Sequence, residues 1–296
     1  MAKAKRVSNA VVRKQVRAQV RVMRTRTDAV RDEDADGVHD LRVASRRLRA
    51  VLTEHEGLFD KRALRKVRER ARRVTRALGR PRELDVSIEV ALRLRNGLHG
   101  PARYAASHVL RQLRAQRAAQ SSAIAKTADR VDSPKFRKAV KTLLNSGPKP
   151  GKLDLGRTAR SLRKRYRAVV AAHAAWQQGS TDESLHALRI EFKKLRYTCE
   201  IYRGINDGHL DNFIASLKEV QESLGEWHDY CILRDYAAEA APSAPAKAEE
   251  GMPLLVEAIE GRRQTLLQEF TAHVEPFFGQ ERQSEIETFL AGLKGA

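Results

Sequence analysis

Apolar residues recur every three or four positions along most of this chain. Leu41, Ala44, Leu48 and Val51 follow this spacing in one segment, and Leu185 starts a similar series in another. Such spacing places apolar side chains on one face of an α-helix, and we find no convincing alternation of the kind that β-strands show. We therefore predict an all-α protein.

Clusters of Pro, Gly and small residues interrupt the helical pattern at two places. They are residues 145–154 (NSGPKPGKLD) and residues 241–253 (APSAPAKAEEGMP), and both compositions are typical of loops or linkers. Together with shorter breaks they predict about ten to twelve helices in two bundles. We place the first bundle at residues 8–145, the linker at 146–154 and the second bundle at 155–292.

An internal repeat supports this division. Residues 38–49 (VHDLRVASRRLR) align without gaps on residues 185–196 (LHALRIEFKKLR), with five identical positions and three that keep their chemistry. Farther along, residues 78–83 (LGRPRE) match residues 224–229 (LGEWHD) at nearly the same offset. Two matches in the same order indicate a duplication, which predicts two pseudo-symmetric helical bundles.

The Leu-Gly pair that starts each second match predicts the end of a helix. Glycine suits the left-handed position that closes many helices, here at Gly79 and Gly225. The acidic residues that follow are predicted to cap the next helix, and they are Glu83, Asp85 and Asp229.

Each repeated helix carries a row of potential cations on one face. At 100° per residue, each row fits an arc of about 80° and extends over about 15 Å. An apolar stripe about 150° away leaves the row free to face something other than the core. Like charges at this spacing repel one another, so solvent or an anion must relieve the repulsion. The rows are His39, Arg42, Arg46 and Arg49 in the first copy, and His186, Arg189, Lys193 and Arg196 in the second.

The charge distribution favours a ligand for these rows over simple solvation. The net charge is +20, but the chain up to Gly147 has 37 basic and 15 acidic residues, and the rest has 20 and 22. The second half is therefore near neutral, yet it keeps its row at the same offsets. Arginine and lysine donate charge-assisted hydrogen bonds to phosphate oxygens. The two rows thus predict a site for a linear polyanion, with binding that weakens as salt rises.

Other basic residues are weaker candidates. Arg72 has a basic counterpart in the second half, Lys218, and we favour that pair. Surface solubility is the alternative role for the remaining auxiliary candidates, which are Arg13, Arg17, Arg76, Arg160 and Lys164.

The histidines His39 and His186 leave three roles open. Among cations each imidazole should be neutral until a polyphosphate favours its charged form, after which it donates to the phosphate. Metal ligation is an alternative, but neither histidine has other ligand types at a familiar chelating spacing. A third role is phosphoryl acceptor, although nothing else in the sequence signals a transferase.

The doubled motif resembles the CHAD family, the conserved histidine α-helical domain. The resemblance rests on residues 38–50, residues 185–197 and the two Leu-Gly pairs, and it extends from about residue 8 to about residue 292. It implies two bundles around a shared basic cavity or pore, binding of inorganic polyphosphate, and association with polyphosphate granules. The implied ligand contacts are His39, Arg42, Arg46, Arg47, Arg49, Arg72, His186, Arg189, Lys193, Lys194, Arg196 and Lys218.

Two departures from the family pattern stand out. The first Leu-Gly pair is followed by RPRELD where the family often has R-D-x-D, so Glu83 replaces an aspartate. Some relatives also carry a triphosphate-hydrolysing domain with an E-x-E-x-K signature. Neither Glu285-Ile-Glu-Thr nor Glu54-His-Glu-Gly completes that signature here.

We therefore predict a non-enzymatic polyphosphate-binding protein with no catalytic residue, metal or cofactor. We expect it in the cytoplasm and off the membrane, because no apolar run approaches about 20 residues and the N-terminus lacks the apolar core of a signal peptide. Cys199 and Cys231 lack the paired spacings of zinc sites or disulfide frameworks. A nucleoid-type nucleic-acid binder is the main alternative, because the net charge would attract any polyanion. An enzyme that uses His39 or His186 on polyphosphate is the second.

Overall fold

Helices make up nearly all of residues 10–146, 155–203 and 209–292, which are the parts of the chain that the computed structural model describes. These ranges contain no β-strand, so the prediction of an all-α protein is confirmed. The helices of the first half are α1 (Ala10–Thr25), α2 (Thr27–Arg31), α3 (Ala35–Glu54), η1 (Glu56–Leu58), α4 (Lys61–Ala77), α5 (Gly79–Asn96), α6 (Gly100–Ala118), α7 (Ser121–Asp132) and α8 (Pro134–Asn145). Those of the second half are α9 (Leu155–Gly179), α10 (Asp182–Tyr202), α11 (His209–Ala240), η2 (Ala241–Ser243), α12 (Ala246–Glu249), α13 (Met252–Phe278) and α14 (Gln280–Gly292).

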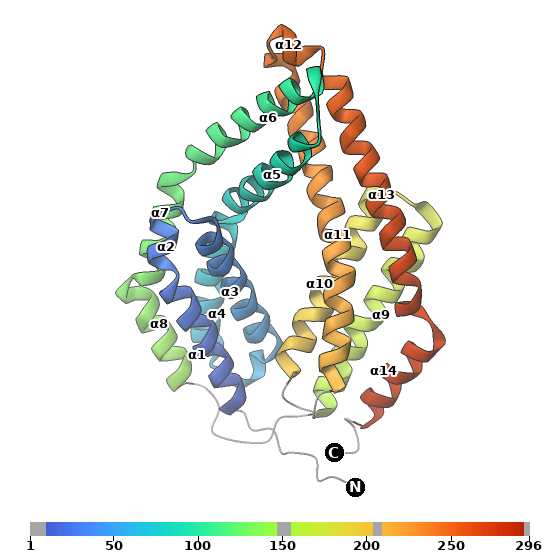
Figure 1. The fold of residues 1–296 in the computed structure, drawn as a ribbon. Coiled ribbons are helices and arrows are strands. Elements are labelled where there is room, and N and C mark those ends of the chain that lie inside the picture. Colours follow the sequence, from blue (N-terminus) through green and yellow to red (C-terminus); the bar gives the residue numbers. More distant parts are fainter. Residues whose placement is uncertain (1–9, 147–154, 204–208, 293–296) are drawn as a thin grey trace.

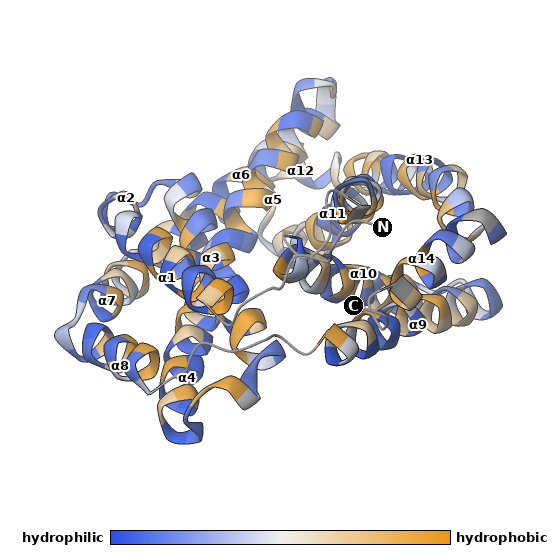
Figure 2. Ribbon diagram, turned by 90° about the horizontal axis from the view of Figure 1, so that it is seen from below, coloured by the Kyte–Doolittle hydropathy of each residue, from blue (hydrophilic) through white to orange (hydrophobic). Residues whose placement is uncertain are grey.

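Helices of each half pack mainly on one another, as Figure 1 shows. In the first half α3 lies between α1 and α4, with α2, α7 and α8 on the outside. In the second half α10 contacts α9 and α11, and α11 contacts α13. The predicted apolar stripes face these contacts, since Leu41, Leu48, Leu188 and Phe192 are fully buried. Seen from below, apolar residues also concentrate where helices meet (Figure 2).

The hairpin of α5 and α6 connects the halves. Both helices contact α11, and α6 also contacts α12 and α13. The approach is so close that a Cβ atom at Gly251 would lie 1.9 Å from the carbonyl oxygen of Pro101, so only glycine fits there. One apolar core runs through both halves. The boundary at 146–154 stays a prediction, because most of those residues lie outside the described ranges.

The two Leu-Gly pairs behave differently. The first separates α4 from α5, but α11 runs through Gly225 without a break, so the predicted helix end is wrong there. Pro81 explains the first break, because it has no N–H to donate and its ring clashes with the preceding turn. Trp227 occupies the matching position in the second half and lets the helix continue. Nor is Gly79 left-handed, since Gly100 is the described glycine with positive φ.

A buried arginine fixes the start of α3. The Arg117 side chain donates to Asp85 at 2.6 Å, to the Glu33 carboxylate at 3.0 Å and to the Glu33 carbonyl at 3.1 Å. Glu33 has a φ of 60°, which strains a non-glycine residue, and Asp34 caps α3 through the Gly37 amide. Arg117 therefore holds the turn that sets where α3 begins.

A corresponding arginine fixes the start of α10. Arg263, which lies 146 positions after Arg117, pairs with Asp182 in the first turn of α10 and donates to Cys231 at 3.2 Å. Ser180, just before α10, has a φ of 45° and lies 147 positions after Glu33. These correspondences support the duplication, which otherwise stays a prediction.

None of the helices in the described ranges combines the length and the apolar character needed to cross a membrane.

We expect Arg117→Ala to lower the free energy of unfolding by about 3–5 kcal/mol, because Asp85 would remain buried without its cation. Urea denaturation measures the change. Arg114→Ala is the control, since this exposed arginine lies on the same helix and its loss should cost no more than about 0.5 kcal/mol. Equal effects from both variants would contradict the role given to Arg117.

Candidate anion-binding site

The two predicted rows meet where α3 contacts α10. Arg42 and Arg46 from α3 lie close enough to Arg189 and Lys193 from α10 to repel them. All four side chains are half-buried. We call these four residues the basic cluster.

Burial and mutual repulsion lower the pKa values of residues in the basic cluster. Burial, together with Arg189, Arg46 and Arg42, lowers the pKa of Lys193 to about 7. Burial also lowers the pKa of Arg42 and of Arg189, and nearby Arg46 lowers both further. The fold therefore holds these cations together against their mutual repulsion, and an anion would relieve the strain.

Unused hydrogen-bond donors accompany the charge. The Nε atoms of Arg42 and Arg189 are buried and have no hydrogen-bond partner. Buried donors in folded proteins are nearly always paired, so these two nitrogens are available to an acceptor only if neighbouring side chains move to admit one. The Nε atoms of Arg47, Arg95 and Arg196 are in the same state, so this feature is not confined to the basic cluster.

Histidines border the basic cluster. Burial and the charge of Arg82 lower the pKa of His39. The His186 ring lies 4.7 Å from that of His228, and burial with neighbouring cations lowers the pKa of His228 to about 3. Their lowered pKa values favour the neutral imidazoles, and a bound anion would act in the opposite direction.

Asp229 faces the basic cluster from α11. Burial raises its pKa to about 6, although Arg189, Lys193 and Arg82 act in the opposite direction. Because Asp229 lies inside α11, the helix-capping role predicted for it is wrong. The other two acidic residues also have side-chain partners. Asp85 pairs with Arg117, and Glu83 accepts from Arg80 at 2.8 Å and from the Tyr236 hydroxyl at 2.9 Å.

Three of the predicted contacts are paired with carboxylates. Glu200 accepts ion pairs from Arg47 at 3.2 Å and from Arg196 at 3.6 Å. Lys194 pairs with Glu191 at 2.5 Å. An anion at these positions would have to compete with an internal carboxylate, which makes these three residues weaker candidates than the basic cluster.

The remaining predicted residues lie farther out. Arg49 and Arg72 line a groove of about 280 Å³, whereas Lys218 lines a separate groove of about 260 Å³ beside Glu200. The auxiliary candidates are at least partly exposed on α1, α4 and α9, and they are Arg13, Arg17, Arg76, Arg160 and Lys164.

Sequence reasoning missed three residues at this site. Arg82 and His228 lie at corresponding positions, 146 residues apart, and both face the basic cluster. Tyr197 contacts two guanidinium groups, with Arg46 at 5.1 Å and Arg196 at 5.3 Å from its ring. The second sequence match, residues 78–83 on residues 224–229, contains both Arg82 and His228. Its Leu-Gly pair, however, predicts only the end of a helix.

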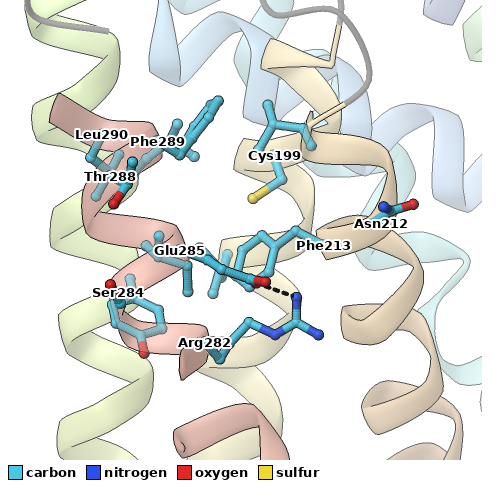
Figure 3. A pocket seen from close by; sticks show the side chains of 14 residues that line it. Cys199, Asn212, Phe213, Arg282, Ser284, Glu285, Thr288, Phe289 and Leu290 are labelled. Atoms are coloured by element: carbon cyan, nitrogen blue, oxygen red, sulfur yellow. Dashed lines mark hydrogen bonds and ion pairs between the residues drawn. The ribbon is translucent and has the colours of Figure 1, made fainter. Parts of the chain in front are cut away.

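A larger cavity lies elsewhere. It has a volume of about 690 Å³ and contains none of the predicted contacts. Its lining includes Leu195, Cys199, Phe213 and Phe289, and its cation Arg282 is paired with Glu285 at 2.9 Å (Figure 3). This lining is mainly apolar, so the cavity does not suit a polyanion.

In the part of the chain that the structure describes, no group of three or more His, Cys, Asp and Glu side chains is placed to hold a metal ion.

Fold and site together define the class of the protein. It is an all-helical protein with a basic cluster at the contact of two repeated helices. The chain belongs to the CHAD domain family, whose model matches residues 14–238.

Two solved structures share this fold. The CHAD domain of the plant Ricinus communis aligns with a TM-score of 0.62 and 18% identity, over 100% of this chain and 96% of that one. PptA from Streptomyces chartreusis aligns with a TM-score of 0.61 and 22% identity, over 88% and 98%. At these identities the likeness shows the fold alone.

Two curated proteins of Mycobacterium tuberculosis, from strains CDC 1551 / Oshkosh and H37Rv, carry the name uncharacterized protein. Each is 26% identical to this chain over 235 residues, which is 75% of this chain. The matched part is 44% of the length of those relatives.

We expect Lys193→Met to raise the free energy of unfolding at pH 6 when no anion is bound, because the native protein must hold Lys193 charged there. The folded pKa of about 7 lies below the ordinary value of 10.5, so this penalty fades as pH rises from 7 towards 10.5, and the gain should shrink over that window. Urea denaturation at pH 6 and pH 10 measures both effects. Lys194→Met is the control, since its exposed ammonium is paired with Glu191. A gain that stays constant with pH would contradict this account.

Proposed function

We propose that this protein binds inorganic polyphosphate at the basic cluster, without transforming it. The proposal rests above all on four half-buried cations from two helices, where burial and then the neighbouring arginines lower the pKa of Lys193 to about 7. A chain of phosphates would neutralise these cations, restore the proton of Lys193 and accept from the orphaned Nε atoms of Arg42 and Arg189.

The burial of the basic cluster favours a thin ligand. Half-buried guanidinium groups between two packed helices would suit a single file of phosphates better than a DNA duplex, which meets best with side chains that project from the surface. Arg82 and the neutral histidines would add donors at the border of the same site. Binding through charge alone would read no sequence and would weaken as salt rises.

Finer features of the resemblance belong to this proposal. They are a basic cavity or pore shared by two pseudo-symmetric bundles, a cytoplasmic location and association with polyphosphate granules. Support comes from the family membership and from the repeated residues on α3 and α10.

Nucleic acid is the alternative that the net charge of +20 keeps open. Labelled long-chain polyphosphate, bound near physiological salt, should resist displacement by duplex DNA, RNA or ATP at equal phosphate concentration. Equal competition by DNA would favour the nucleic-acid alternative instead.

We expect Arg42→Ala combined with Arg189→Ala to weaken polyphosphate binding at least about tenfold, because both guanidinium groups donate from the basic cluster. Arg111→Ala combined with Arg114→Ala is the control, since these arginines are exposed on α6. Titration of labelled polyphosphate measures affinity, and circular dichroism confirms equal helical content. Equal losses from both double variants would mean that the net charge of the protein, and not the basic cluster, determines the affinity.

Polyphosphate incubated with the protein and Mg²⁺ for hours should keep its chain length on a gel. We propose binding without chemistry because the sequence contains no glycine-rich phosphate loop and no carboxylate cluster recognisable as a metal site. Shortening that persists in the purified protein but disappears in His39→Ala or His186→Ala would establish the enzymatic alternative.

A further inference from the structure

A second basic surface follows α4, outside the basic cluster. Lys61, Arg65, Arg68 and Arg72 are spaced four, three and four residues apart, so they share one face of α4 over about 17 Å. Their side chains are exposed or half-buried. We call these four residues the α4 track.

Two grooves along the α4 track overlap. One, of about 280 Å³, is bordered by Arg49 of α3 and by Glu69. The other, of about 570 Å³, includes Arg157 from the second half of the chain. Arg65 and Arg68 line both grooves, so the two form one continuous basic surface.

Arg49 joins this surface to the basic cluster. Burial and the charges of Arg72, Arg46 and Arg68 lower the pKa of Arg49, which places its guanidinium between the two groups. A polyanion that leaves the basic cluster past Arg46 would therefore meet Arg49 and then the α4 track, with each cation close to the next.

In the described part of the second half, the positions equivalent to Arg65 and Arg68 carry no cation. At the repeat offset of 146, Asp211 takes the position of Arg65 and Ile214 takes that of Arg68. Ile214 is buried, and Asp211 is paired with Arg203 at 2.6 Å. Among the described residues, Arg65 and Arg68 therefore extend the row of cations on the α4 side in a way that the second half does not repeat.

We propose that the α4 track holds the part of a long polyphosphate chain that extends beyond the basic cluster, so that the protein binds long chains more tightly than short ones. This inference rests on the proposed function. Each additional phosphate that meets a cation releases counterions, so the added affinity should depend strongly on salt. Glu56, 3.8 Å from Arg68, and Glu69, 3.9 Å from Arg72, partly neutralise the track and limit the gain.

The test compares Arg65→Gln plus Arg68→Gln with Arg111→Gln plus Arg114→Gln. Both pairs lie three residues apart on a helix, all four arginines are at least partly exposed, and both double variants remove two charges. Affinity is measured for tripolyphosphate and for a long polyphosphate of defined length, each at several salt concentrations.

We expect the α4 pair to weaken long-chain binding about five- to tenfold and to reduce its salt slope by about one to two, with tripolyphosphate binding unchanged. The α6 pair should change neither. Conversely, Glu69→Gln should strengthen long-chain binding while leaving tripolyphosphate unaffected.

The proposal for the α4 track would be overturned if Arg65→Gln plus Arg68→Gln left long-chain binding undiminished. An equal loss in Arg111→Gln plus Arg114→Gln would also overturn it. Failure of the proposed function has a different signature. In that case Arg42→Ala combined with Arg189→Ala would leave the binding of both probes intact.

Discussion

Repulsion between cations at the contact of α3 and α10 is the constraint on which the site depends. Arg42, Arg46, Arg189 and Lys193 would separate if they were free, and burial together with the neighbouring arginines lowers the pKa of Lys193. The apolar faces of the same helices supply the opposing force, because their leucines and Phe192 are buried on the opposite side. Folding energy thus holds these cations together at the candidate site.

Two buried arginines fix where the two helices of the basic cluster begin. Arg117 fixes the strained turn before α3, and Arg263 fixes the first turn of α10. The position of each basic row along its helix axis depends on where the helix starts, so these distant side chains influence the site without touching a ligand. Their spacing of 146 residues equals that of the second sequence match, residues 78–83 on 224–229.

Charge alone is a poor guide to which basic residues act. Arg47 and Arg196 belong to the repeated motif, yet both are occupied by Glu200. Lys193 and Lys194 are neighbours in sequence, but the first faces other cations and the second faces Glu191. Pairing with an internal carboxylate therefore helps to rank the basic residues. The ranking is one of degree, because Asp229 faces the basic cluster and Glu56 and Glu69 partly neutralise the α4 track.

The sequence by itself determined the helical class, the apolar stripes, the basic rows and the break before α5, because helical periodicity and the missing amide of Pro81 act within a few residues. It also pointed to the family through the doubled motif. The tertiary structure alone decided that α11 continues through Gly225, that the α5–α6 hairpin reaches across to α11, and that Arg82, Tyr197 and His228 join the site. These outcomes depend on distances between helices far apart in the chain, and no local pattern of residues encodes such distances.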